Sequence, residues 1–173
     1  MPCTGRPATT RTCLAGAGAD TLLGGEGADV LDGGPDADGL YGEAGDDTYL
    51  FNPGGGQDVI ADSDATPGNT DTARFGATID PLDLVVAQIG NDLVLSVHAT
   101  AETLTVRDWY SGSDGQVEVI EAGDGGRLLS TQVQQLIQDM ATYTAATGLT
   151  WDQAIDQRPD EVQVVLAAHW QPA

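Results

Sequence analysis

The sequence predicts a mainly β protein, in which a parallel β-roll is followed by a β capping region and C-terminal α-helices. Three observations predict this fold: a nine-residue repeat, a series of short β-type segments after it, and helical periodicity at the end of the chain. We assign residues 15–64 to the roll, 65–129 to the capping region and 130–173 to the helical tail. Residues 1–14 are interpreted as a disordered leader or a fragment boundary.

Five nine-residue units define the first region. They span 15–23, 24–32, 33–41, 42–50 and, after a two-residue insertion, 53–61. The sixth position is aspartate and the eighth is large and apolar in every unit, and glycines gather at positions one, two and four. The aspartates are Asp20, Asp29, Asp38, Asp47 and Asp58, and the apolar residues are Leu22, Leu31, Leu40, Tyr49 and Ile60.

This period predicts a flattened solenoid. Positions seven to nine are long enough for a very short strand, and the glycine-rich positions before it can turn the chain sharply. Nine residues then make half a coil and eighteen make a full one, with coils stacked at about 4.8 Å, the spacing of neighbouring strands. Asp20 is therefore expected beside Asp38, Asp29 beside Asp47, and Asp38 beside Asp58.

The capping region and tail follow from other patterns. Strands are expected over Thr72–Phe75, Leu84–Ile89, Leu93–Val97, Thr103–Val106 and Val117–Glu121, with a tight hairpin turn at Gly90-Asn91-Asp92. A helix is expected after Ser130 as N-cap, with its end at Gly148. Thr150 with Gln153 resembles a capping box, and Pro159 suits the first turn of a last helix.

Charge indicates what the roll binds. The chain carries 27 acidic and six basic residues, for a formal charge of −21, which disfavours nucleic acid and anionic membranes as partners. Twelve acids and no basic residue lie between Ala15 and Asp64. Facing carboxylates and the carbonyls of glycine turns need a cation, and calcium suits such oxygen ligands better than magnesium does. Zinc prefers Cys and His, which this region lacks. We therefore expect ion binding and folding to be one event.

The repeat resembles the G-G-x-G-x-D-x-U-x signature of the RTX (repeats-in-toxin, haemolysin-type) calcium-binding family. The resemblance implies a β-roll that holds Ca²⁺ between stacked turns, by the aspartates and by carbonyls of the first four turn residues. We expect about three ions. The ligand set carried over to this chain is Gly16, Gly18, Asp20, Gly24, Gly25, Glu26, Gly27, Asp29, Gly33, Gly34, Pro35, Asp36, Asp38, Gly42, Gly45, Asp47, Gly54, Gly56 and Asp58.

Some units depart from that signature. Asp36 stands where glycine is usual, Glu43 occupies a second position, and the fifth unit opens with Pro53. We expect the end units to bind calcium weakly. The segments DTARFGATIDPLDLVVAQIGNDLVLSV, LTVRDWYSG and VEVIEAGDGG resemble the region that follows the repeats in haemolysin-type proteins, and VQQLIQDMATY with VVLAAHW is similar to their C-terminal ends.

The resemblance also implies a bacterial, secreted, extracellular protein that leaves the cell through a type I secretion apparatus. The tail is then either a helix that packs on the protein or a segment that the apparatus reads unfolded. The chain has no apolar run long enough to cross a membrane, and Met1 to Ala19 lack the apolar core of an ordinary signal peptide. We expect a monomer. Cys3 and Cys13 are a candidate disulfide.

Two functions are open at this point. The first is a non-enzymatic calcium-binding module that supports secretion and stability of a larger protein. The second is a carbohydrate- or surface-binding accessory module of an extracellular enzyme or adhesin. His98 and His169 are isolated and are interpreted as packing or surface residues, and Trp109 and Tyr110 as core residues rather than a sugar platform. No serine lies in a pattern that suggests nucleophilic catalysis.

Overall fold

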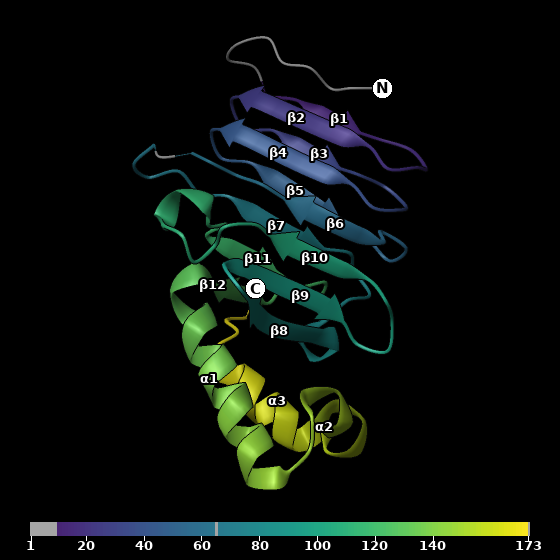
Figure 1. Ribbon diagram of the computed structural model, residues 1–173, viewed down its shortest axis with the longest axis vertical. Helices are drawn as coiled ribbons and strands as arrows, with labels where there is room; N and C mark the ends of the chain where they lie inside the picture. Colours follow the sequence, from purple (N-terminus) through teal and green to yellow (C-terminus); the bar gives the residue numbers. More distant parts are fainter. Residues whose placement is uncertain (1–9, 65, 173) are drawn as a thin grey trace.

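The computed structural model describes residues 10–64 and 66–172, and its strands form two six-stranded sheets. The first sheet has the order β1 (Thr12–Leu14), β3 (Val30–Asp32), β5 (Thr48–Phe51), β7 (Thr72–Phe75), β11 (Val119–Glu121) and β12 (Arg127–Leu129). The second has the order β2 (Thr21–Glu26), β4 (Gly39–Ala44), β6 (Gln57–Ile60), β10 (Thr103–Val106), β9 (Asp92–Val97) and β8 (Leu84–Ile89). Successive strands of the repeats alternate between the sheets, which face each other along the long axis (Figure 1).

The repeats form the expected parallel β-roll, because strands eighteen residues apart pair in register. Leu31 lies opposite Tyr49 in one sheet, and Leu22 lies opposite Leu40 in the other. All five apolar residues at the eighth position are buried between the sheets, at 0–2% exposure. The prediction of a mainly β fold with a β-solenoid and C-terminal helices is therefore confirmed.

The roll includes a strand before Ala15, where we expected it to begin. Thr12 lies opposite Val30, and Cys13 lies opposite Leu31 and is buried like the apolar residues at the eighth position. Cys13 is disulfide-bonded. Cys3, the partner that the sequence offers, is outside the described residues.

The capping region continues both sheets rather than closing them with a separate layer. Each sheet stays parallel as far as β11 or β10 and then becomes antiparallel, at β11–β12 and at β10–β9–β8. The short 3-10 helices η1 (Pro81–Asp83) and η2 (Ser113–Gly115) lie in its loops. Strands β8 and β9 form the expected hairpin, since Ile89 pairs with Asp92 across Gly90 and Asn91.

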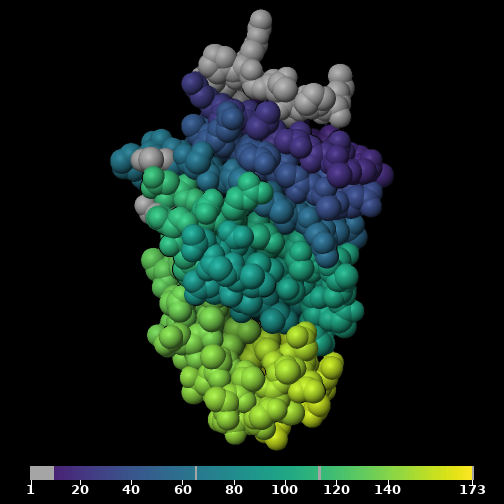
Figure 2. Space-filling model, in the orientation of Figure 1, coloured from purple at the N-terminus to yellow at the C-terminus, as the bar shows by residue number. Residues whose placement is uncertain are grey.

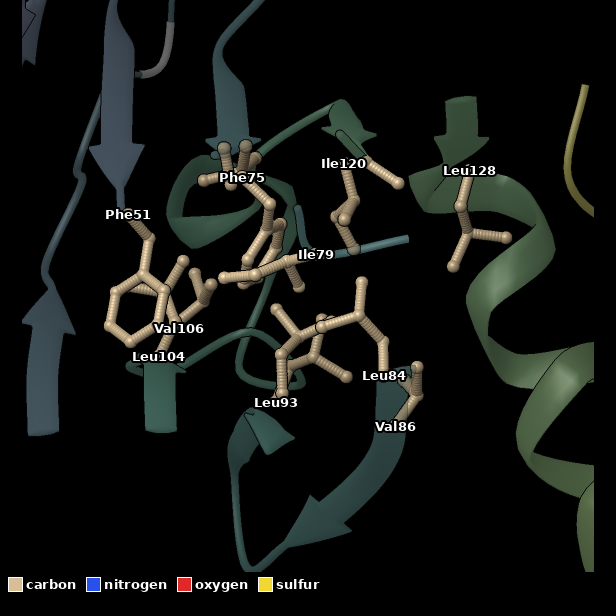
Figure 3. Packing of buried hydrophobic residues seen from close by; sticks show 14 of the residues in the cluster. Phe51, Phe75, Ile79, Leu84, Val86, Leu93, Leu104, Val106, Ile120 and Leu128 are labelled. Atoms are coloured by element: carbon tan, nitrogen blue, oxygen red, sulfur yellow. The ribbon is translucent and has the colours of Figure 1, made fainter. Parts of the chain in front are cut away.

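Buried apolar side chains of the roll and the capping region pack together where the two join (Figure 3). Phe51 and Phe75 meet edge to face, with ring centroids 5.5 Å apart, and both are buried. Leu84, Leu93 and Ile120 add fully or nearly fully buried side chains to the same cluster. The inserted Phe51 thus anchors the roll to the capping region.

Three helices complete the fold at the end opposite to β1 (Figure 1). They are α1 (Ser130–Thr147), α2 (Trp151–Gln157) and α3 (Pro159–Ala167). Gly148 ends α1 in a left-handed conformation, and Thr150 and Gln153 form the expected capping box. The prediction that Ser130 is an N-cap is wrong: the N-cap is Leu129, because the Ser130 N–H still donates to Glu118 O in the sheet.

The chain is layered along its long axis in sequence order, from the repeats to the helices (Figure 2). In the part of the chain that the structure describes, no helix is both long and apolar enough to span a bilayer.

Candidate calcium sites

The sixth-position aspartates form two rows, one along each sheet. The Asp20 N–H donates to Asp38 Oδ1 at 2.7 Å, and the Asp38 N–H donates to Asp58 Oδ1 at 2.9 Å. On the other sheet the Asp29 N–H donates to Asp47 Oδ1 at 2.7 Å. The neighbours expected from the eighteen-residue period are therefore neighbours in the structure. In each accepting carboxylate, Oδ1 is hydrogen-bonded to the backbone of the preceding coil.

The second oxygen of three of these carboxylates has no partner. Asp29 Oδ2, Asp38 Oδ2 and Asp47 Oδ2 are buried and accept no hydrogen bond, and the three residues are only 1–3% exposed. A buried anionic oxygen without a partner costs far more than one that is hydrogen-bonded. Each turn therefore holds an acceptor that a cation would satisfy.

These oxygens face the first glycine of their own turn, so the turn tolerates no side chain there. A Cβ atom on Gly24 would lie 2.8 Å from Asp29 Oδ2 and 2.7 Å from the Gly42 carbonyl oxygen of the next coil. A Cβ atom on Gly33 or Gly42 would overlap Oδ2 of the aspartate in the same turn. Glycine at the first position leaves a small cradle beside Oδ2, which at Gly24 is also lined by a carbonyl oxygen.

The turns also need left-handed backbone at positions two and four. Gly25 and Gly27 both have φ of 109°, and the two non-glycine residues in these places, Glu43 and Asp36, have φ of 74° and 83°. Asp36 Oδ2 accepts the Gly18 N–H at 2.9 Å. The departures from the repeat signature thus keep the backbone shape of the turn.

Burial and mutual repulsion oppose ionisation of three of these aspartates, Asp38, Asp47 and Asp58. Burial is the largest cause, and it raises the pKa of Asp47 and of Asp58 to about 7, with neighbouring carboxylates adding to the effect. The pKa of Asp38 is raised for the same reasons. Backbone N–H donors partly counter the rise. A bound cation would supply the positive charge that ionised carboxylates need here.

The donor set fits a hard cation that accepts carbonyl ligands. Among the described residues, no three acidic, histidine or cysteine side chains converge as a metal-binding group. Any ion in these turns must therefore combine aspartate oxygens with backbone carbonyls, which Ca²⁺ accepts with flexible geometry. Oxygen ligands alone do not suit zinc.

The structure places the expected ligand residues in four different settings. It brings together Gly24 with Asp29, Gly33 with Asp38, and Gly42 with Asp47. Glu26 and Pro35 are exposed, and Pro35 could contribute only its carbonyl oxygen. In the fifth unit, the Gly54 N–H donates instead to Glu102 Oε1 of the capping region at 2.6 Å. In the first unit, Gly16 and Gly18 are exposed and Asp20 is only partly buried.

Sequence reasoning missed the continuation of one row beyond the repeats. The Asp47 N–H donates to Asp71 Oδ1 at 2.8 Å, and the Asp71 N–H donates to Glu118 Oε2 at 2.8 Å. Asp71 Oδ2 accepts Asn69 Nδ2 at 2.8 Å and its carboxyl also contacts Asp62, which raises the pKa of Asp62 together with burial. The only signal was Asp71 two residues before a buried position, and that position is the small Ala73.

The residues considered for other chemistry lie elsewhere. Trp109 is 2% exposed and so presents no platform to a sugar, and Tyr110 packs against the core. His98 contacts Asp152 and Asp156 of α2, and His169 contacts Asp139 of α1. Both histidines thus connect elements of the fold.

Comparison with known protein families agrees with this geometry. Residues 14–49 match the model of the RTX calcium-binding nonapeptide repeat, in four copies. The matched segment contains all three turns whose aspartates have an unpartnered Oδ2.

Proposed function

Because residues 14–49 are RTX calcium-binding nonapeptide repeats, we propose that this chain is a calcium-dependent folding module of a larger secreted protein. The observation that carries the proposal is the set of three buried, unpartnered carboxylate oxygens at Asp29, Asp38 and Asp47. Each would help to hold one ion, so about three ions are expected. Bound calcium would neutralise the facing carboxylates and take carbonyl oxygens of the glycine turns as further ligands.

The proposal includes the compartment and the route. Free calcium is about millimolar in extracellular fluids, where sites with dissociation constants of about 10⁻⁴–10⁻³ M are at least half occupied, whereas such sites are empty in the cytosol. A chain that folds only when it meets calcium could leave a bacterial cell unfolded through a type I secretion apparatus. The resemblance of the tail to the ends of exported proteins supports this route. We further propose that the module is monomeric and has no catalytic role.

A calcium titration tests the proposal directly. We expect the far-UV circular dichroism spectrum to gain β signal between micromolar and millimolar calcium, and equilibrium dialysis to count about three ions. Magnesium at the same concentrations serves as the control, because it gives up its waters reluctantly and suits carbonyl cages less well. An unchanged β signal in EGTA, with no bound ion at millimolar calcium, would contradict the proposal.

Export is tested separately. The chain fused behind a reporter protein is expressed with and without a type I secretion apparatus, and the reporter is measured in the medium. A matched fusion without residues 130–173 tests whether the tail carries the signal. Equal export of both fusions would remove the tail from the proposal while leaving calcium binding intact.

A further inference from the structure

Arg11 occupies the place of an aspartate at the N-terminal end of one row. Thr12 lies opposite Val30, so Arg11 stands opposite Asp29 as Asp29 stands opposite Asp47. The Arg11 N–H donates to Asp29 Oδ1 at 2.7 Å, the same distance at which the Asp29 N–H donates to Asp47 Oδ1. The backbone of the roll therefore treats Arg11 as a sixth-position residue.

The Arg11 side chain contacts a carbonyl that belongs to the turn. Its Nη1 donates to Gly24 O at 3.3 Å. Gly24 is related by the eighteen-residue period to Gly42, whose carbonyl oxygen lies close to the cradle beside Asp29 Oδ2. The guanidinium thus meets, one coil nearer the N-terminus, the carbonyl that corresponds to one lining a candidate ion site.

On the other side of the unpartnered oxygens of this row, a nitrogen donor is also present. Asp71 Oδ2 corresponds in register to the unpartnered Oδ2 atoms of the repeats, but it accepts Asn69 Nδ2 at 2.8 Å. Between these ends, Asp29 Oδ2 and Asp47 Oδ2 have no partner. The unpartnered carboxylate oxygens of this row therefore lie between two side-chain donors of the protein, one from Arg11 and one from Asn69.

We propose that the Arg11 guanidinium is a built-in cation that takes the place of a calcium ion at the first coil and so ends the row of ions. The inference rests on the proposed calcium binding of the remaining turns. Arginine carries its charge at all physiological pH values and presents several N–H donors, so it can serve carbonyl oxygen without a metal. At the outermost coil, where water would compete for an ion, a tethered charge does not dissociate.

Two substitutions at Arg11 test the inference. Arg11→Gln removes the charge but leaves the backbone bonds, and we expect amide exchange of Val30, whose N–H donates to Arg11 O at 2.8 Å, to become about tenfold faster in calcium. Arg11→Asp restores an acidic row, and we expect one more calcium ion per chain by equilibrium dialysis. The Cys13 disulfide is kept intact in every variant.

The control is Arg107→Asp, which makes the same change of charge at an exposed position outside the rows. It is expected to leave both the number of ions and Val30 exchange unchanged. Wild-type exchange in Arg11→Gln, or an unchanged number of ions in a folded Arg11→Asp chain, would overturn the inference alone. If wild type itself bound no calcium, the proposed function would fail and this inference with it.

Discussion

The roll and the region after it share both sheets but are stabilised in different ways. In the roll, each nine-residue unit buries one large side chain, and three buried carboxylate oxygens lack partners. In the capping region and tail, strands and helices pack a dense apolar core that includes Trp109, Leu95 and Leu136. The continuity of the sheets shows that a change in stabilisation need not coincide with a break in hydrogen bonding.

The shared sheets predict the order in which the two regions fold. Strands β7 and β10, which belong to the capping region, pair directly with β5 and β6 of the roll. A capping region that folds by apolar burial presents two strand edges on which coils can assemble once calcium is present. We expect the roll to order from its C-terminal coil towards β1.

Removal of calcium is the largest perturbation. In EGTA we expect amide protection of β2–β5 to fall by more than about a hundredfold, because the unpaired carboxylates then repel each other. Protection of α1 is expected to fall far less, since its buried face contacts other apolar groups. Hydrogen exchange with mass spectrometry resolves the two regions in one experiment. Equal loss in both would show that they fold as a single unit.

A matched pair of core substitutions distinguishes the stability of the roll from that of the tail. Leu40 in the roll and Leu136 in α1 are both fully buried, so Leu→Ala deletes the same atoms at each site. The cost is expected to be about 2–5 kcal/mol in either place. Leu40→Ala is expected to raise the calcium midpoint of folding, and Leu136→Ala to lower the stability of the calcium-free tail. Thermal and calcium titrations measure both effects. If Leu136→Ala raised the calcium midpoint and Leu40→Ala destabilised the calcium-free tail, the two regions would not be stabilised in the different ways described.

Substitutions of Asp38 test whether one of its oxygens accepts a backbone hydrogen bond while the other binds calcium. Asp38→Ala removes both the acceptor of the Asp20 N–H and the candidate ion ligand. Asp38→Asn keeps one acceptor and loses the charge. We expect both to raise the calcium midpoint by about tenfold or more, with the larger shift for alanine. Asp80→Ala, in an exposed residue outside the repeats, is the control, and an equal shift there would contradict the assignment.

Acidity is expected to act oppositely on the two forms of the roll. In the calcium-free fold the pKa values of Asp47 and Asp58 are about 7, above those of the unfolded chain. Their contribution to stability is therefore present at low pH and is lost as pH rises through about 7. Calcium needs the ionised carboxylates, so its affinity is expected to rise from pH 5.5 to 8. Calcium titrations at several pH values, with exchange in EGTA as the reference, measure both trends.

The smallest expected effect lies at the contact between the capping region and α2. His98 Nδ1 and Nε2 contact Asp152 at 2.9 Å and Asp156 at 3.1 Å, and these bonds raise the pKa of His98. The contribution is fully present below the unfolded pKa of about 6.5 and is lost as pH rises through the folded value. His98→Gln is expected to cost about 0.5–1 kcal/mol at pH 6 and nothing at pH 9. Thermal melts of the α2 signal at both pH values test this, and a pH-independent cost would contradict it.

Much of this architecture could be predicted because the same residue pattern recurs in every nine-residue unit. The eighteen-residue period predicts that Asp29 lies beside Asp47, and the structure confirms it. The continuation of the row through Asp71 and Glu118 was not predicted from the sequence. The segment between Asp47 and Asp71 is longer than one coil of the repeats, so the periodicity is lost there. Arg11 escaped because its register comes from pairing with β3, and nothing in its own residue type marks it as part of the roll.

The alternation of strands between two sheets limits how such a chain can grow. An insertion of eighteen residues returns the chain to the same sheet and the same row, so it adds one complete coil to the roll. An insertion of nine would send every later strand to the opposite sheet and set Phe51 and β7 against the wrong neighbours. Lengthening by duplication is therefore expected only in pairs of units, and the same rule applies to anyone who builds longer versions of this protein.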